Sequence, residues 1–218
     1  MIHILWATAR PTLFMETYNI WLQKAVDSTR IKIYTAVNTD AEAEVLKEYN
    51  CMVTGDNVGV TIPATALSKK IFNMDLPDDD IVIFASDDMF PPVNWDVLLD
   101  NQFDGYNGCI VFNDGIQYNP IVTLPIMTFD TLKQLNGIIY NPAYTHSYSD
   151  NELYDNLVEL GMIRDIRRSA ALIVFEHRHH IVGKRKADKI DVKFLTHEGT
   201  DHAIYNRRKS MSLEDKIR

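Results

Sequence analysis

Hydrophobic and polar positions in the first ninety residues form a pattern that predicts strands and helices in turn. Short apolar runs predict strands at 2–7, 30–37, 51–54 and 80–86. The segments between them predict helices at 12–28, 41–49 and 63–73, with loops at 8–11, 38–40 and 55–59. Such alternation is typical of a parallel sheet with helices on both faces, which binds ligands at the carboxyl ends of its strands.

The second half of the chain has a less regular pattern. It predicts strands at 109–114, 121–127 and 170–176, and helices at 129–136 and 150–160. The last twenty residues are polar and are expected to form a helix or a tail. No internal repeat, low-complexity segment or linker interrupts the chain, so we expect one α/β domain.

Composition is that of an ordinary globular protein, with 46% hydrophobic and 24% charged residues over 218 positions. The two cysteines, Cys51 and Cys109, match no metal or redox spacing, which favours a reducing compartment. The N-terminus lacks the charged start of a signal peptide, and no apolar stretch is long enough to span a bilayer. We therefore expect a cytoplasmic protein, located in a bacterial host if a phage encodes it.

Charge is unevenly distributed along the chain. The formal net charge of −8 gives no overall attraction for nucleic acid. Residues 78–104 contain eight Asp and no Lys or Arg, whereas residues 177–193 contain six Lys or Arg and two acids. The first pattern suits a metal site and the second suits a polyphosphate, although a solvated surface explains most such charges.

Two adjacent acids, Asp87 and Asp88, directly follow the most apolar predicted strand. Carboxylates at the end of a buried strand are costly unless a cation compensates them, and Mg²⁺ or Mn²⁺ prefers oxygen ligands. A polar turn in which one Asp caps the next segment is the alternative interpretation. Two prolines and Trp95 follow closely and offer a rigid support, which favours the metal site.

The segment SDNELYDNLVELG (149–161) predicts a helix with three leucines on one face and a glycine just past its end. Ser149 and Glu152 match a capping box, which by itself explains the polar residues at this helix start. A carboxylate at a helix N-terminus that faces a cleft is equally suited to act as a general base. Both interpretations stay open at this point.

The segment EHRHH (176–180) places three histidines in four residues after an apolar run. In extended backbone, His177 and His179 point the same way and His180 points the opposite way. An imidazole from this segment can complete a metal site that begins with Asp88, and a mixed set of His and carboxylate ligands suits Mn²⁺. The alternative is a surface cluster of His and Arg without a ligand role.

These three patterns occur in an order that resembles the GT-A glycosyltransferases, broadly the inverting family 2 and its small phage and bacterial members. The resemblance covers roughly residues 1–195 and implies a three-layer α/β/α fold with a mostly parallel central sheet. Within a single domain spanning 1–218, it implies a nucleotide-binding half at about 1–95 and an acceptor and catalytic half at about 96–195. A polar C-terminal tail follows.

The resemblance implies a role for each acidic and histidine motif. In that family a strand ends in an acidic motif, of which one acid contacts the ribose and the next binds the metal that bridges the diphosphate. Ser86-Asp87-Asp88 resembles this motif, which implies Asp87 near the ribose and Asp88 on Mn²⁺ or Mg²⁺. Ala85 stands where the family's usual first Asp falls.

The late segment 176–188 is similar to one found in small members, in which a His ligates the metal, and this implies His177 or His179 as ligand. The family's E-D-x-D/E-L helix start resembles SDNEL (149–153). Its second-place Asp is the catalytic base of inverting members. This implies Asp150 as the base and Glu152 as a group that helps to position the acceptor.

The nucleotide site is implied in the same way. TARP (8–11) resembles the first nucleotide loop, the loop at 38–40 occupies the place where the base is held, and a late basic residue covers the phosphates. Lys184 or Arg185 is suited to that last role. The implied nucleotide-binding residues are Thr8, Ala9, Arg10, Asn38, Asp40, Ser86, Asp87 and Lys184.

The implied activity is transfer of a hexose or pentose from a nucleotide-sugar, by default a UDP-sugar, to an acceptor hydroxyl. The acceptor remains open among a glycan, a lipid-linked glycan, a protein and a modified DNA base, and the oligomeric state is not readable from the sequence. Three other functions stay possible: a nucleotidyltransferase, a non-catalytic nucleotide-sugar-binding protein and a metal hydrolase. WATARPTLF lacks the glycines of a nucleotidyltransferase phosphate loop.

Overall fold

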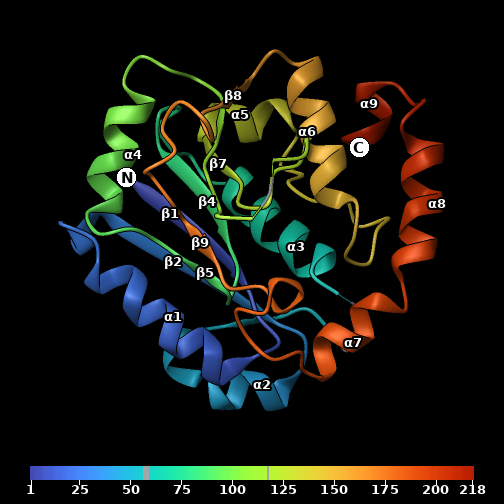
Figure 1. Cartoon of the computed structure of the whole chain (residues 1–218), viewed down its shortest axis with the longest axis horizontal. Helices are drawn as coiled ribbons and strands as arrows, with labels where there is room; N and C mark the ends of the chain where they lie inside the picture. Colours follow the sequence, from blue (N-terminus) through green and yellow to red (C-terminus); the bar gives the residue numbers. More distant parts are fainter. Residues whose placement is uncertain (56–58, 117) are drawn as a thin grey trace.

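A computed structural model describes residues 1–55, 59–116 and 118–218. The loop predicted at 55–59 lies mostly outside these residues. The described chain forms a mixed α/β structure in which a central sheet is sandwiched between two layers of helices (Figure 1). None of the described helices has the length and apolar composition needed to cross a bilayer.

The central sheet has seven strands that are mostly parallel, which confirms the predicted fold class. Only β7 runs antiparallel to both of its neighbours, β4 and β6. In spatial order the strands are β3 (Met52–Val53), β2 (Ile31–Val37), β1 (Ile2–Ala7), β4 (Ile81–Ala85), β7 (Ile126–Thr128), β6 (Cys109–Val111) and β8 (Ile163–Asp165).

Alternating side chains of the central strands build two separate cores. In β1, Ile2, Ile4 and Trp6 pack on one face, and Leu5 packs on the other. The helices on the first face are α1 (Pro11–Gln23), α2 (Asp40–Val45) and α4 (Trp95–Phe103), and those on the second face are α3 (Thr61–Phe72), α5 (Phe129–Gln134) and α6 (Ser149–Glu159). Short 3₁₀ helices occupy Ser28–Arg30, Lys47–Tyr49 and His180–Val182.

A second, two-stranded sheet positions the histidine motif. Strands β5 (Met89–Phe90) and β9 (Glu176–His177) pair antiparallel, with Met89 opposite His177. The next amide, that of Arg178, donates to the carbonyl of Asp88 over 2.8 Å. The late histidines are therefore fixed beside the acidic turn that follows β4.

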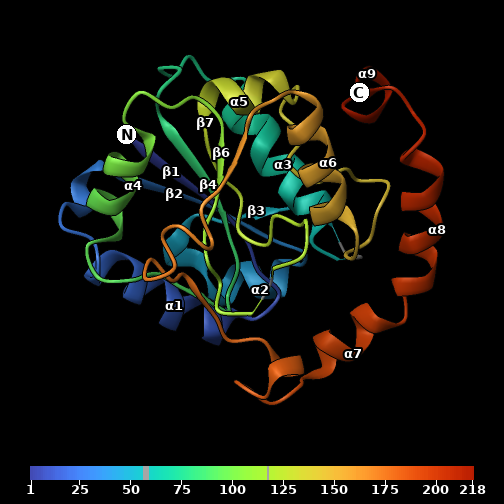
Figure 2. The same cartoon turned by 45° about the horizontal axis from the view of Figure 1, so that its top comes forward.

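The C-terminal residues form an arm of helices, one of the two outcomes expected for this polar stretch. Helices α7 (Lys189–Leu195), α8 (Glu198–Arg208) and α9 (Leu213–Lys216) run along the outside of the domain (Figure 2). Arg208 of α8 forms a buried ion pair of 2.8 Å with Glu152 of α6. The hydrophobic pattern of the sequence does not reveal this ion pair, which holds the polar arm against α6.

Three tryptophans connect the first core to the turn after β4. The indole N–H of Trp95 donates to the carbonyl of Trp21, and that of Trp21 donates to the carbonyl of Met89, both over 2.8 Å. The indole of Trp6 donates to Oδ1 of Asp87 over 2.9 Å. All three side chains are fully buried, so their packing and their hydrogen bonds fix this turn together.

Several predicted boundaries were wrong. Helix α1 ends at Gln23 and not at residue 28, because buried Asp96 accepts hydrogen bonds from the amides of Val26 and Asp27. The strand predicted at 109–114 ends at Val111.

Two apolar runs were also misassigned. Of the strand predicted at 121–127, only the last residues belong to β7, since Pro125 has no amide to donate to a ladder. In the strand predicted at 170–176, only Glu176 pairs in β9, and residues 168–172 form turns. Both runs are mostly irregular chain, and periodicity alone cannot distinguish an apolar run of this kind from a buried strand. The sequence analysis did not predict α4, β5 or β8.

We predict that Trp95→Ala destabilises the fold by about 3–5 kcal/mol, because it removes a fully buried ring and the hydrogen bond to Trp21. The midpoint of thermal unfolding should fall by roughly 10 °C. Val97→Ala on the same helix, at a position that is 39% exposed, is the matched control and should cost less than about 0.5 kcal/mol. Equal losses in the two variants would contradict the packing role of Trp95.

Candidate functional site

A cavity of about 320 Å³ opens at the carboxyl ends of β1, β2 and β4. This is the edge of an open α/β sheet at which ligands bind. Most residues singled out from the sequence line this cavity: Thr8, Ala9, Arg10, Asn38, Ser86, Asp87, Asp88, Asp150, His177 and His179. The sheet topology thus brings together four loops and one helix start that lie far apart in the sequence.

The carboxylate of Asp87 is held rigidly in the floor of the cavity. Its Oδ1 accepts from the Trp6 indole and its Oδ2 accepts from the Thr8 hydroxyl, each over 2.9 Å. Burial raises the pKa of Asp87 to about 7, although these two hydrogen bonds lower it. Further donors from a ligand would stabilise the ionised form.

Asp88 is surrounded by groups that favour its ionised form. The Ser86 hydroxyl donates to Oδ1 over 2.9 Å, and Arg185 approaches Oδ2 at 3.4 Å. Burial alone would raise the pKa of this carboxyl, but the nearby imidazole, hydroxyl and guanidinium groups outweigh burial and hold the pKa well below its usual range. Asp88 is therefore a carboxylate at neutral pH.

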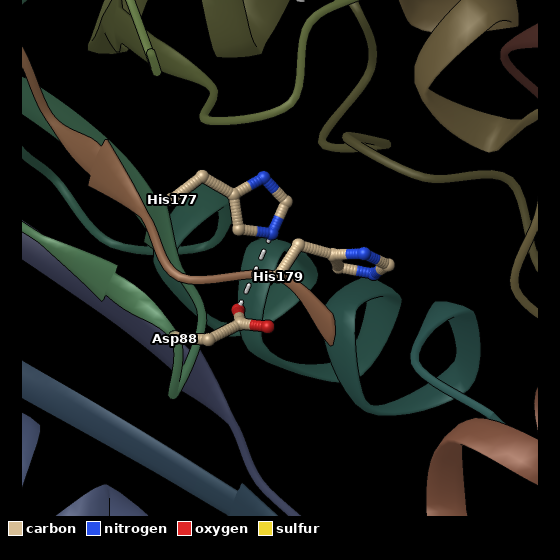
Figure 3. A group of neighbouring side chains, drawn as sticks. All are labelled: Asp88, His177 and His179. Atoms are coloured by element: carbon tan, nitrogen blue, oxygen red, sulfur yellow. Dashed lines mark ion pairs between the residues drawn. The ribbon is translucent and has the colours of Figure 1, made fainter. Parts of the chain in front are cut away.

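The side chains of Asp88 and His177 face each other, and the ring of His179 lies beside them (Figure 3). One ligand atom from each lies within 4.8 Å of the others, and Nε2 of His177 is 3.6 Å from Oδ1 of Asp88. One carboxylate oxygen with two imidazole nitrogens is a donor set that fits Mn²⁺. The structure thus brings together the three residues that the sequence singled out for a metal.

The two imidazoles differ in protonation. Burial would lower the pKa of His177, but Asp114 and Asp88 raise it to about 9, so this ring is protonated at neutral pH. A metal ion would have to displace that proton. Burial lowers the pKa of His179 to about 4, so its ring is neutral and able to act as a ligand.

Asp114 is a site residue that the sequence analysis missed. It is buried, and its Oδ2 lies 3.9 Å from Nδ1 of His177 and accepts from the Thr123 hydroxyl over 2.9 Å. Its Oδ1 accepts from the amide of Ile116 over 2.8 Å. A carboxylate on the far nitrogen of a ligating imidazole orients the ring and raises its basicity.

Asp150 lies in the first turn of α6, on the cavity wall. Burial raises the pKa of its carboxyl to about 6, although the amide of Asn151, which donates to Oδ1 over 3.0 Å, lowers it. The predicted capping box is wrong. Tyr148 is the N-cap, Ser149 donates instead to the carbonyl of His146, and the Glu152 carboxylate does not reach the helix start.

Three residues singled out from the sequence do not line the cavity. Glu152 is buried behind it, where its carboxylate accepts from Arg208 and from the Tyr144 hydroxyl, so it is placed to hold structure and not to contact an acceptor. Asp40 is exposed at the start of α2. Lys184 lies 3.6 Å from Glu176.

Arg185, and not Lys184, is the basic residue of that segment on the cavity wall. It pairs with Asp191 over 2.7 Å, and Arg10 pairs with the same carboxylate over 2.7 Å and with Asp188 over 2.6 Å. The ion cluster of Arg10, Arg185, Asp188 and Asp191 closes one side of the cavity. Neighbouring basic residues in a loop give no sequence signal that tells which one points inward.

The comparisons with known proteins support the fold. No protein-family model matches this sequence, and no curated protein sequence matches it. Solved structures do match. Residues 1–349 of S. aureus TarS, in complex with UDP, are 14% identical with a TM-score of 0.57, and the match covers 98% of this chain and 76% of that one. The match to a longer TarS chain covers only 34% of its length.

Two further structures are similar to this chain. A Drosophila β-1,4-galactosyltransferase 7 variant, in complex with manganese, UDP-Gal and xylobiose, is 14% identical with a TM-score of 0.53, over 90% of this chain and 79% of that one. The mannosyltransferase PcManGT from Pyrobaculum calidifontis, in complex with GDP-Man and Mn²⁺, is 12% identical with a TM-score of 0.55, over 75% and 53%. The chain therefore has the GT-A fold of these glycosyltransferases.

We predict that Asp150→Asn stabilises the ligand-free protein at alkaline pH. Because burial raises the pKa of this carboxyl from 3.8 to about 6, its contribution to stability is present below about pH 4 and is lost as the pH rises through 6. The variant should unfold a few degrees above the wild type at pH 8, and the difference should disappear near pH 4. Thermal unfolding across this range measures it.

The exposed Asp104→Asn is the control for this series and should show no such pH-dependent gain. A variant of Asp150 that is less stable than the wild type at pH 8 would show that the ionised carboxylate stabilises the fold, contrary to this account.

Proposed function

We propose that this chain is a metal-dependent glycosyltransferase that moves a sugar from a nucleotide-sugar to an acceptor hydroxyl with inversion. The observation that carries the proposal is the meeting of two groups of residues around one cavity of a GT-A fold. One is the donor set of Asp88, His177 and His179, and the other is the carboxylate of Asp150. The first group suits a diphosphate-bound metal and the second suits a general base.

Mn²⁺, or less favourably Mg²⁺, is the proposed cofactor. Asp88, His177 and His179 would hold it, and Asp114 would orient His177. When bound, the metal supplies Lewis-acid stabilisation of the charge that develops on the diphosphate leaving group. Two imidazoles in the set favour Mn²⁺ over Mg²⁺, which prefers oxygen ligands.

The nucleotide is proposed to lie across the loops after β1, β2 and β4. The Asn38 side chain lines the cavity, and its buried Oδ1 has no hydrogen-bond partner among the described residues, so this amide is available to the base. Asp87 is fixed by Trp6 and Thr8 and keeps lone pairs for a ribose hydroxyl. Uracil is the default base, since TarS and the Drosophila enzyme were solved with uridine nucleotides.

Phosphate charge would be met by Arg10 and Arg185, which already lie on the cavity wall. Both guanidinium groups are held by Asp191 in this structure, with the charge of Arg185 also facing Asp88. A diphosphate that enters the cavity would compete with these carboxylates for the two arginines. The ion cluster thus offers pre-positioned donors for an anionic ligand.

Asp150 is the proposed base that takes the proton of the acceptor hydroxyl as this oxygen attacks the anomeric carbon. Its pKa of about 6 leaves it ionised at neutral pH and still basic enough to share a proton, which suits general-base catalysis. A single displacement of this kind inverts the anomeric centre. The acceptor is proposed only as a hydroxyl compound.

The proposal predicts metal-linked binding of a nucleotide. UDP with Mn²⁺ should raise the midpoint of thermal unfolding, by a free energy of about 2.7 kcal/mol at a hundredfold excess over Kd. EDTA should abolish the shift, and Asp88→Ala should abolish it because it removes the only carboxylate of the donor set. A panel of UDP, GDP, CDP, ADP and dTDP identifies the base.

A panel in which no nucleotide shifts the wild type would overturn the donor half of the proposal. A shift that survives both EDTA and Asp88→Ala would leave a nucleotide site without the proposed metal. His202→Ala, which changes an imidazole on α8 away from the cavity lining, is the matched control and should keep the shift.

We further predict that Asp114→Asn weakens Mn²⁺ binding by about 10- to 100-fold, because the amide no longer supports the His177 ring as a carboxylate does. Titration calorimetry with Mn²⁺ in the presence of the bound nucleotide measures the change. Asp96→Asn is the matched control, since Asp96 is also buried and accepts backbone amides, but these are the amides of Val26 and Asp27, and it forms no ion pair with His177. Equal losses of affinity would contradict a specific role for Asp114.

A further inference from the structure

One buried carboxylate of the C-terminal arm contacts the turn that leads into α6. Asp201 of α8 is fully buried. Its carboxylate accepts hydrogen bonds from three consecutive backbone amides, those of residues 145, 146 and 147, each over 2.9 Å. Charge-assisted bonds to backbone amides are strong, and three of them fix a turn of this length in one conformation.

The same turn is held from its other side by the start of α3. The amide of Val60 donates to the carbonyl of Thr145 over 3.1 Å, and the Thr61 hydroxyl donates to the carbonyl of Tyr144. Gly59 lies so close that an added Cβ would stand 1.9 Å from the Thr145 oxygen. The turn is therefore clamped between α3 and α8, with no room to shift toward α3.

The last residue of the turn has a backbone conformation that its side chain disfavours. Tyr148 has φ of 64°, in the left-handed region, which is strained for a residue other than glycine. Its ring stacks on His202 and Tyr205 of α8, with centroid distances of 4.9 and 5.6 Å. Contacts with α8 thus hold a strained residue that lies two positions before Asp150.

A fourth contact joins α8 to the first turn of α6 itself. Arg208 donates to both carboxylate oxygens of Glu152 over 2.8 and 2.9 Å, and both side chains are buried. Glu152 lies two residues after Asp150. The contacts from α8 therefore bracket Asp150 on both sides along the chain, although Asp201, Glu152 and Arg208 do not line the cavity.

We propose that α8 positions the catalytic carboxylate: Asp201, acting through the turn at residues 145–147, sets where Asp150 lies relative to the metal donor set. Asp201 is a positioning residue and contacts no ligand. The inference rests on the proposed function, since it takes Asp150 as the base. It assigns a task to the polar C-terminal arm, which the sequence predicted as a helix or a tail.

Asp201→Asn tests the inference. An amide has a single acceptor oxygen, so its NH₂ would face a backbone N–H and at least one of the three bonds is lost. The assay is UDP release from UDP-glucose, UDP-galactose or UDP-GlcNAc in Mn²⁺, with water as acceptor. We expect kcat to fall by roughly 10- to 100-fold, since a misplaced base loses the proper geometry, while KM and the Kd of UDP change less than about twofold.

Hydrogen exchange provides a readout that does not depend on turnover. In Asp201→Asn, the amides of residues 145–150 should exchange at least about tenfold faster, while those of β1 and β4 stay protected. Glu159→Gln is the matched control, because Glu159 of α6 also contacts the C-terminal arm, through Lys216 of α9 over 3.6 Å, but pairs neither with an amide of the turn nor with a ring that stacks on Tyr148. It should leave both kcat and exchange at wild-type values.

Tyr148→Gly is a second variant for the case in which Asp201→Asn does not fold. Glycine tolerates the left-handed conformation, so the fold is kept while the stack on α8 is lost. kcat should again fall with UDP binding retained. Unchanged kcat overturns the inference, and so does unchanged exchange of the amides of residues 145–150 in Asp201→Asn. A loss of UDP affinity as large as the loss of kcat overturns it as well. If the wild type itself neither binds UDP nor releases it from a UDP-sugar, the proposed function is overturned.

Discussion

Burial of two adjacent carboxylates at the end of β4 is the constraint on which the site depends. Strand β4 is buried along its whole length, so Asp87 and Asp88 leave a hydrophobic core directly into a closed turn. Uncompensated, such charges are costly. The chain compensates them in different ways: neutral donors, Trp6 and Thr8, bind Asp87, whereas the cationic His177 and Arg185 face Asp88. Pairing of β5 with β9 is what brings the histidine to this place, and it thereby assembles a metal donor set from segments about ninety residues apart.

Aspartates that are saturated by backbone amides differ in their role from aspartates that face the cavity. Asp96 and Asp201 are saturated by backbone amides, and they fix the chain after α1 and the turn before α6. The carboxylate of Asp150 accepts a hydrogen bond from the amide of its neighbour Asn151. It faces the cavity, and its pKa is raised. Asp88 faces the cavity as well. A carboxylate that is satisfied internally stabilises the fold, whereas one that faces a cavity costs stability and remains available for chemistry, a balance expected at functional sites.

Much of this architecture could be predicted from local pattern. The hydrophobic pattern predicts the buried strands 2–7 and 80–86 well, because each is a short apolar run between loops. The second strand predicts that Asp87 and Asp88 lie at a ligand-binding edge of the sheet. The rest depends on contacts distant in sequence. The apolar run at 170–176 forms turns at 170–172, where Leu172 is 98% exposed, and it joins a sheet only at Glu176, which pairs with distant β5. Glu152 has a partner, Arg208, that lies 56 residues away, and Asp114 is recognisable as a site residue only once His177 is placed beside it.

Asp150 and the metal donor set are proposed to act on one nucleotide-sugar bound between them. The sharpest test is the rate of UDP release from a panel of UDP-sugars in Mn²⁺, compared between the wild type and Asp150→Asn. We expect the variant to bind UDP as the wild type does and to release it at least about 100-fold more slowly, because the general base is absent. Equal rates in the two proteins would remove Asp150 from the reaction, and an absence of release by the wild type from every UDP-sugar would contradict the assignment of a UDP-dependent transferase.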